Sequence, residues 1–296
     1  MNEAYTAPEN KLITIENKYI KAGFLTDVGG RMVFLSYKNS DNLLYSDSTL
    51  WNEAKSERIP LSADAPFKAY NGFITWVGPQ SEWWTQQDIL LQKKSDADMW
   101  PPDPYIIYSD FEIVEKTDTS IVLENDASPV SGIKLRKQFI LSGNKIEIKV
   151  SGTNCRKTPV SWDLWSNIRF DPFTIFKIPV DQNSTIKIDT TSNQFLETID
   201  SRIQNGYFTF LPKQPKNNPG KRMAKAYIYP AKGNIIAQIH NVQLSVVFEK
   251  IARNRIHPKQ ALIEVYNCVA TNPESNLLEL EHHSEYKTLK PNESIN

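Results

Sequence analysis

Residues 70–84 read YNGFITWVGPQSEWW, and after a short charged insert residues 99–104 read MWPPDP. Four of the seven tryptophans of the chain lie in this region, namely Trp76, Trp83, Trp84 and Trp100. The glycines and prolines between them exclude a continuous helix and predict loops of fixed shape. The region is therefore expected to carry broad aromatic surfaces on well-defined loops.

Flat indole faces beside a few polar side chains suit a sugar, whose ring offers C–H faces for stacking and hydroxyls for hydrogen bonds. We predict a saccharide-binding platform in which at least two of the four tryptophans are partly exposed. The expected contacts come from Trp76, Gln80, Trp84, Trp100 and Asp103. The alternative is that the tryptophans fill one end of a β-sandwich core, as large aromatic residues commonly do.

Outside this region, short runs of alternating apolar and polar residues are separated by turn residues. Ile133–Leu141 and Lys145–Gly152 flank the turn Ser142–Asn144, and Tyr105–Val114 is also predicted to be a strand. The pattern shows no alternating helices and no repeat of about 20 to 50 residues, which excludes parallel α/β folds, propellers and solenoids. The sequence predicts one all-β domain over 1–296, a large antiparallel β-sandwich.

Composition limits the partners of the protein. Lys+Arg and Asp+Glu number 34 each over 296 residues, so no net field attracts nucleic acid or an anionic membrane. No apolar run approaches the ~20 residues of a membrane span. Met1–Asn10 show no signal-peptide pattern, which leaves the cytoplasm or, if a leader was removed, the periplasm or the exterior. We expect a monomer in which Cys155 and Cys268 are buried free thiols.

The common cofactor and metal motifs are missing from the sequence. There is no glycine-rich phosphate loop, no C-x-x-C pair and no H-E-x-x-H segment. His282 and His283 are adjacent, so on a strand they point to opposite faces and cannot jointly hold one ion. We expect no cofactor and no histidine-based metal site, while the carboxylates leave a cation site open.

The carboxylates near the C-terminus carry more information. Alternation in Leu277–His282 places Glu279 and Glu281 on one strand face and leucines on the other. The two acids form either a solvated face or, across a cleft from the tryptophans, a general base and hydroxyl acceptors. Asp163, bracketed by two tryptophans, is either an exposed position of an edge strand or another site carboxylate.

Three segments resemble the galactose mutarotase-like superfamily. GGRMVFLSYKNSDNLL at 29–44 is similar to its first strands, and ELE at 279–281 followed by TLKPNES at 288–294 is similar to its last strands. GPQSEWW at 78–84 with WPPDP at 100–104 looks like an uncharacterised domain family within that superfamily. The resemblance implies an antiparallel β-supersandwich with a sugar-binding cleft.

The resemblance also implies roles for individual residues. Mutarotases of this superfamily use a glutamate of a C-terminal strand as base, and Glu279 matches it best, with Glu281 next. Their acid histidine lies in a mid-chain strand where this chain has SWDLWSN at 161–167, so Asp163 stands in its place. Asp163 could act as the acid only if burial raised its pKa. Arg31 and Arg136 are expected to hold a sugar hydroxyl or carboxylate by paired hydrogen bonds.

Three function classes fit these features. The missing histidine slightly favours a carbohydrate-binding protein whose partner is a mono- or oligosaccharide. The second class is a carbohydrate-active enzyme, of the aldose epimerase or lyase kind, with Glu279 as general base. The third is a structural sandwich without a ligand. An observation that discriminates between the classes is whether Glu279, Asp163 and Arg136 converge in one cleft with Trp76 and Trp100.

Overall fold

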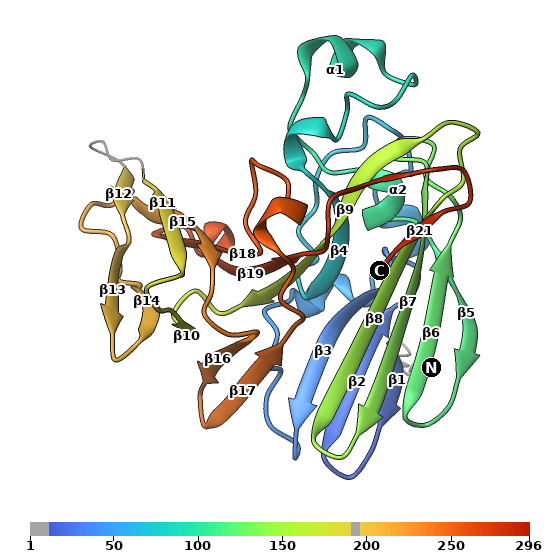
Figure 1. The fold of residues 1–296 in the computed structure, drawn as a ribbon. Helices are drawn as coiled ribbons and strands as arrows, with labels where there is room; N and C mark the ends of the chain where they lie inside the picture. Colours follow the sequence, from blue (N-terminus) through green and yellow to red (C-terminus); the bar gives the residue numbers. More distant parts are fainter. Residues whose placement is uncertain (1–11, 191–195) are drawn as a thin grey trace.

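The computed structural model describes residues 12–190 and 196–296, and its regular structure is predominantly β (Figure 1). Alternation of side chains explains the strands. In β7 (Ile133–Ser142) the residues from Ile133 to Leu141 alternate between buried and half-buried, as expected for a strand covered on one face. The prediction of an all-β fold with antiparallel sheets is confirmed.

The largest sheet contains both β4 of the tryptophan-rich region and β19, which carries Glu279 and Glu281. Its strands run in the order β1-β2-β3-β4-β9-β19-β18-β15-β11, with β12 parallel to β15 and β20 beside β9. Their bounds are β1 (Ile13–Glu16), β2 (Ile20–Leu25), β3 (Arg31–Tyr37), β4 (Phe73–Gly78), β9 (Val160–Phe170), β11 (Thr185–Asp189), β12 (Leu196–Thr198), β15 (Lys221–Tyr229), β18 (Ile263–Ala270), β19 (Leu277–His283) and β20 (Lys287–Leu289).

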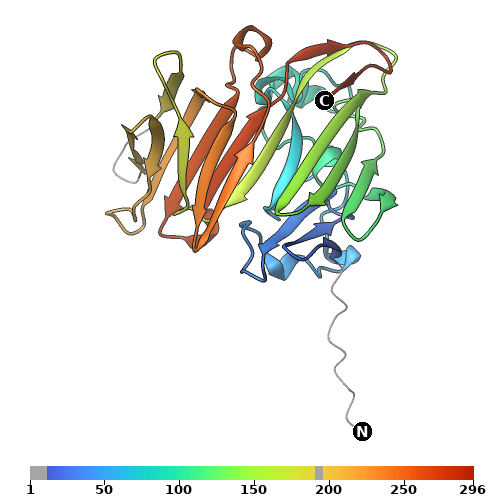
Figure 2. The same ribbon diagram turned by 60° about the horizontal axis from the view of Figure 1, so that its bottom comes forward.

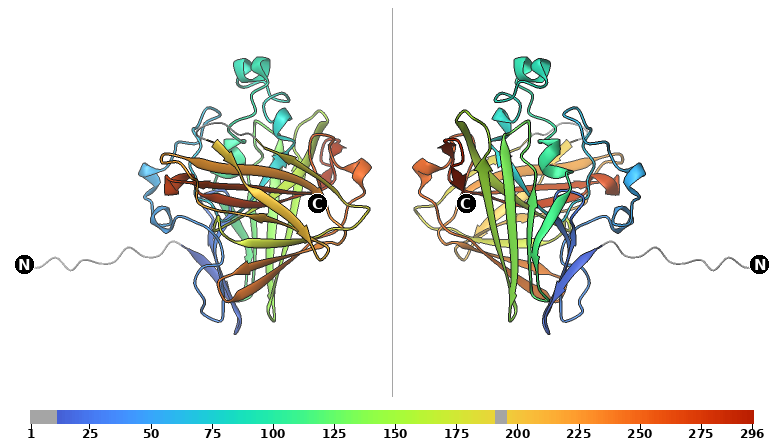
Figure 3. Two further views of the ribbon diagram at one scale, coloured as in Figure 1. Left: turned by 90° about the vertical axis from the view of Figure 1, so that its left-hand side faces the viewer. Right: turned by 90° about the vertical axis from the view of Figure 1, so that its right-hand side faces the viewer.

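Two smaller sheets complete the β structure. One has the order β13-β14-β10-β16-β17 and the other β21-β8-β7-β6-β5. Figure 2 shows the second sheet, in green, on the other side of β9 from the orange-to-red strands, and in Figure 3 β6–β8 run across the direction of those strands. The bounds are β5 (Phe111–Lys116), β6 (Ser120–Asn125), β8 (Lys145–Asn154), β10 (Ile175–Pro179), β13 (Asp200–Gln204), β14 (Tyr207–Leu211), β16 (Asn234–Ile239), β17 (Val242–Val247) and β21 (Ser294–Ile295).

Helices are short and lie mainly in the loops. They are α1 (Leu91–Asp96), α2 (Pro104–Ile107) and 3-10 turns at Ser48–Leu50, Lys55–Glu57, Gln80–Glu82, Arg253–Arg255 and Pro273–Ser275. The predicted strand Tyr105–Val114 is therefore wrong in its first half, since strand structure begins only at Phe111. The reason is local: Asp103 accepts a hydrogen bond from the backbone N–H of Tyr105, and Pro104 occupies the first helical position.

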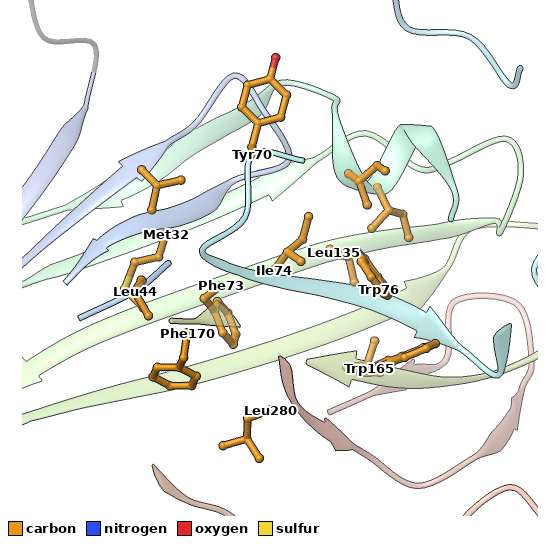
Figure 4. Close-up of a cluster of buried hydrophobic side chains, with 14 of the residues drawn as sticks. Met32, Leu44, Tyr70, Phe73, Ile74, Trp76, Leu135, Trp165, Phe170 and Leu280 are labelled. Atoms are coloured by element: carbon orange, nitrogen blue, oxygen red, sulfur yellow. The ribbon is translucent and has the colours of Figure 1, made fainter. Parts of the chain in front are cut away.

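Strands β4 and β9 lie between the two halves of the molecule and anchor one continuous core. Phe73 of β4, Phe170 of β9, Leu280 of β19 and Leu135 of β7 belong to the same buried cluster (Figure 4). Full burial of each such side chain stabilises the fold by about 1.5–3 kcal/mol. Because β9 pairs with β4 on one side and β19 on the other, it brings the tryptophan-rich region next to the C-terminal carboxylates.

Two further expectations concern the surface and the termini. Among the residues that the structure describes, no helix is long and apolar enough to cross a membrane. Both cysteines are free; Cys268 is buried as expected, but Cys155 directly follows the end of β8 and is exposed, which corrects that prediction. The segment Met1–Asn10, examined above for a signal peptide, lies outside the described residues.

Candidate functional site

A cavity of about 450 Å³ opens where the tryptophan-rich region meets strands β9, β15, β18 and β19. A more open hollow of about 500 Å³ adjoins it through Lys221 and Ser275, but its lining is largely apolar. The cavity instead combines aromatic, charged and amide side chains, as ligand sites commonly do. It is lined by Phe67, Ala69, Asn71, Trp76, Gln80, Trp83, Trp100, Trp165, Arg169, Lys221, Lys225, Tyr266, Glu274, Ser275, Asn276, Leu277, Glu279 and Glu281.

Aromatic rings form one wall of the cavity. Trp76 and Trp165 are cross-strand partners of β4 and β9, with ring centroids 5.1 Å apart (Figure 4). Trp83 packs edge-to-face on Trp76 at 5.7 Å, and Trp100 packs on Phe67 at 4.7 Å. Within the described residues, the indole N–H groups of Trp76 and Trp165 have no hydrogen-bond partner. Such buried unpaired donors commonly mark a place for water or a ligand.

The exposures of the four tryptophans correct part of the platform prediction. Trp100 is 49% exposed, whereas Trp76, Trp83 and Trp84 are 5%, 1% and 0% exposed. Only Trp100 is therefore open to solvent, not at least two of the four. Trp76 and Trp83 still line the cavity, but Trp84 lies outside it and donates its indole N–H to the carbonyl of Pro101.

Two ion pairs form the floor of the cavity. Glu279 and Arg169 are directly opposed on β19 and β9, and their Oε1 and Nη2 atoms lie 2.7 Å apart. Arg169 also donates to the side-chain oxygen of Asn71. These contacts hold the Glu279 carboxylate at the cavity surface, where alternation of the strand had placed it.

The second charged group is buried and consists of Lys225 between two glutamates. The Lys225 Nζ atom lies 2.7 Å from Glu264 Oε2 and 2.9 Å from Glu281 Oε2. Burial opposes the ammonium charge, but the two carboxylates together raise the pKa of Lys225 above its ordinary value. Glu281 lines the cavity together with Lys225 and Glu279, which fits the cleft alternative rather than the solvated face, and Lys225 engages one of its two carboxylate oxygens.

Asp163 lies behind the cavity and does not line it. It is fully buried, with Oδ1 3.3 Å from His283 Nδ1. A Cβ atom added to Gly78 would lie 2.5 Å from the same oxygen, so Asp163 can pack here only against a glycine. Burial raises the pKa of Asp163, and the neighbouring His283 opposes the rise. The pKa of Asp163 is thus shifted in the direction that a general acid requires, but Asp163 does not lie next to the cavity where a ligand would bind.

Three other predicted contact residues lie in the interior. Arg31 donates to the backbone carbonyls of Asn71 and Ile107 and sits behind Arg169. Asp103 caps α2 and accepts from the Ser128 hydroxyl at 2.6 Å. Together with Trp84, they are corrected to structural positions, because their hydrogen bonds go to groups of the fold and they do not line the cavity.

Arg136 lies on β7 of another sheet, where it forms a part-exposed ion pair with Glu124. The expectation that Arg136 and Asp163 share one cleft with Glu279, Trp76 and Trp100 is therefore wrong. Gln80, by contrast, lines the cavity beside Trp100 and donates its amide to the Met99 carbonyl at 2.8 Å.

Two cavity residues of central position were not found from the sequence. Arg169 lies four residues after Trp165, so strand alternation places both on one face. This alternation is a local signal in the sequence that points to Arg169. Lys225 stands in KRMAKAY at 221–227 and has no local feature that separates it from a solvated lysine. Its role follows from the pairing of β15 with β18, which the local sequence does not specify.

Comparisons with solved structures support the fold. A galactose mutarotase-like protein from Lactobacillus casei ATCC 334 shares 12% identity, with a TM-score of 0.54 over 96% of this chain and 97% of that chain. Slr1438 from Synechocystis sp. PCC 6803 shares 14% identity, with a TM-score of 0.54 over 100% and 96%. A TPR-domain containing protein from Parabacteroides distasonis ATCC 8503 has a TM-score of 0.53 at 14% identity, over 96% of this chain and 45% of that chain.

At these identities the likeness establishes the galactose mutarotase-like fold and leaves activity open. The search of curated proteins finds no match. Residues 11–296 match the family described as "Domain of unknown function (DUF4380)". The chain therefore belongs to the DUF4380 family, and its fold is that of the galactose mutarotase-like proteins, as the resemblance in its first and last strands predicted.

Proposed function

We propose that the cavity binds a mono- or oligosaccharide. The observation that carries the proposal is the half-exposed Trp100, packed at a tilt against Phe67, at a cavity that Arg169, Lys225 and Glu279 also line. An exposed indole face offers stacking to the C–H face of a sugar ring, while the charged floor offers donors and acceptors for its hydroxyls. The described cavity is large enough for a small organic ligand.

The balance of charge favours a neutral sugar over a strongly anionic one. Arg169 is neutralised by Glu279, and Lys225 is shared by Glu264 and Glu281. An acidic sugar would have to displace one of these buried carboxylates from its cation, which costs more than forming a new exposed pair. Sugar hydroxyls, in contrast, can donate to the carboxylates and accept from the cations without breaking either pair.

A saccharide screen tests this proposal directly. Tryptophan fluorescence and isothermal titration calorimetry against neutral and acidic mono- and oligosaccharides should identify a neutral ligand. Trp100→Ala should then weaken binding at least about 10-fold, because a stacked ring contributes on the order of 1.5 kcal/mol or more. Arg136→Ala, remote from the cavity, is the matched control and should leave affinity unchanged. Equal affinities in the wild type and Trp100→Ala would remove the aromatic wall from the site.

A second candidate function is an aldose isomerase or epimerase in which Glu279 is the general base. The supporting observation is that Arg169 holds the Glu279 carboxylate at the cavity surface. Glu279→Gln should reduce the rate of anomer interconversion at least ~100-fold with little loss of affinity. Polarimetry on the ligand found by the screen measures this rate. A wild-type rate equal to that of the buffer would leave sugar binding without catalysis.

A further inference from the structure

Two glutamates face each other beside the cavity in an arrangement that needs a cation. Glu264 of β18 and Glu281 of β19 are direct cross-strand partners, and His283 follows two residues later on the same face. Like charges at such opposed positions repel each other. All three side chains are at most 2% exposed, so water does not screen that repulsion. Lys225 contacts one oxygen of each glutamate and compensates only part of the charge.

The three groups lie close together on the side of His283, where Glu264 Oε1 also accepts from the Ala261 backbone N–H at 3.0 Å. His283 Nε2 lies 3.4 Å from Glu264 Oε1, and these two groups with Glu281 offer ligand atoms all within 4.8 Å of one another. Within the described part of the chain, Glu281 Oε1 and His283 Nε2 have no hydrogen-bond partner. Unpaired polar atoms at this depth cost on the order of 1–3 kcal/mol each. Three inward-facing acceptors therefore surround a place that a cation would stabilise.

The other nitrogen of His283 is held as in metal-bound histidines. His283 Nδ1 lies 3.3 Å from Asp163 Oδ1 and 2.9 Å from the side-chain amide of Gln260. Gln260 Nε2 can only donate to Nδ1, whereas the Asp163 carboxylate can only accept from it. Binding of an ion at Nε2 requires the tautomer that carries its proton at Nδ1 and donates it to Asp163. Asp163 thereby acquires a role that its distance from the cavity had not explained.

We propose that Glu264, Glu281 and His283 bind a divalent transition-metal ion, with Zn²⁺ as the expected ion. In a tetrahedral zinc site with bonds of about 2.1 Å, neighbouring ligand atoms are about 3.4 Å apart, which is the separation of His283 Nε2 and Glu264 Oε1. Glu281 would approach by roughly 1 Å to complete the third bond. Because Glu281 also lines the cavity, the ion would reach these ligands from the cavity side.

This inference separates His283 from its neighbour. His282 takes no part, since it points to the other strand face and packs on the Phe248 ring at 5.1 Å. The two histidines still cannot share one ion, but the proposal departs from the expectation of no histidine-based site, because His283 joins Glu281 of its own strand and Glu264 of the facing strand. The inference stands without any saccharide, so its test is independent of sugar binding.

The test is titration of the purified, chelator-treated full chain with Zn²⁺, Mn²⁺ and Ca²⁺ in a metal-free buffer. We expect one Zn²⁺ per chain at micromolar affinity or tighter, weaker Mn²⁺ and no Ca²⁺, because imidazole favours zinc and calcium requires oxygen ligands. Co²⁺ should give the intense visible absorption bands of a tetrahedral site. Thermal melting should rise with Zn²⁺, since an ion that binds only the folded state stabilises it.

Variants distinguish this site from adventitious binding. His283→Asn and Glu281→Gln should each weaken Zn²⁺ at least about 10-fold, since each removes a ligand. His240→Asn, at an exposed histidine, should change nothing. Lys225→Met should bind Zn²⁺ more tightly, because it removes a competing cation. Absence of stoichiometric Zn²⁺ on the folded wild type, or equal affinity in Glu281→Gln and the wild type, would overturn the proposal and leave a proton bridging His283 and Glu264.

Discussion

Two buried lysines show how differently the two regions of this molecule treat charge. Lys225, in the cavity region, places its ammonium between two carboxylates. Lys137, in the interior beneath β3, donates to the Gly29 carbonyl at 2.7 Å and lies over the Phe111 ring at 4.6 Å. Burial opposes both charges, yet the pKa of Lys225 is raised and that of Lys137 is lowered well below its ordinary value. Residue type alone does not separate a site from a core; the available partners do.

The same contrast holds for the other groups of each region. In the interior, the side chains of Arg31, Trp84 and Asp103 bind backbone or hydroxyl groups of the fold itself. At the cavity, Arg169 and Glu279 pair with each other and border open space. Groups whose partners belong to the fold contribute to stability, whereas groups that border open space are available to a ligand. Five substitutions, compared in three experiments, test this distinction.

The largest effect is expected from the tryptophan pair Trp84 and Trp100. Trp84→Ala should lower the free energy of unfolding by about 3–5 kcal/mol, because it empties a fully enclosed site in the interior. Trp100→Ala should lower it by less than ~1 kcal/mol, since half of that ring is already in solvent. Urea denaturation followed by circular dichroism measures both. Equal losses would show that the two rings belong to one core and would end the comparison.

A smaller loss is expected from Asp103→Ala. This change removes the helix cap of α2, leaves the Ser128 hydroxyl without its acceptor and leaves the Ser131 N–H with Ser128 Oγ alone. The free energy of unfolding should fall by about 2–3 kcal/mol, with saccharide affinity unchanged. Denaturation and calorimetry on the same variant check the two parts. If the variant lost saccharide affinity but kept the stability of the wild type, Asp103 would be a binding residue and not a structural one.

The smallest effect, of opposite sign, is expected from Lys137→Met. It removes a buried ammonium whose described partners are backbone carbonyls and an aromatic ring, and should raise the free energy of unfolding at pH 7 by about 1 kcal/mol. Unfolded chains keep the lysine proton up to about pH 10.4, whereas the folded protein releases it at lower pH. The free energy of unfolding of the wild type should therefore rise relative to that of the variant as pH rises toward 10.

Denaturation at pH 7 and pH 9.5 measures this difference. The advantage of Lys137→Met over the wild type should shrink between the two values. Lys225→Met provides the contrasting case, because there the lysine is paired and its removal leaves two buried carboxylates uncompensated. If Lys137→Met were the more destabilised of the two, the classification of the two regions would be wrong.

The sequence predicted the fold class and part of the site because both depend on local patterns. Alternation places Glu279 and Glu281 on one strand face whatever their partners are, and the resemblance in the first and last strands fixes the overall architecture. The helix α2 was missed because the cap formed by Asp103 and Pro104 outweighed the apolar pattern of Tyr105–Val114.

The partners of those carboxylates could not be predicted from local sequence. Lys225 meets Glu281 only because β15 and β19 both flank β18, and Asp163 meets His283 only through the pairing of β9 with β19. Exposure was equally hidden, since Trp84 and Trp100 occupy similar Trp- and Pro-rich contexts and only the packed loop separates them. Sheet order, which arises from contacts distant along the chain, decides which side chains become a site.

The placement of β9 between β4 and β19 also has a consequence for biosynthesis. The cavity needs residues near positions 76, 169, 225 and 279 at once, so it cannot exist until the last strands have left the ribosome. Until then, β9 presents an unpaired apolar edge where β19 will add, a surface prone to pairing with other chains. Such long-range closure predicts slow folding. A chain that ends before β19 should accumulate as aggregate rather than as a folded fragment. Folding of the whole protein therefore depends on synthesis of its final segment.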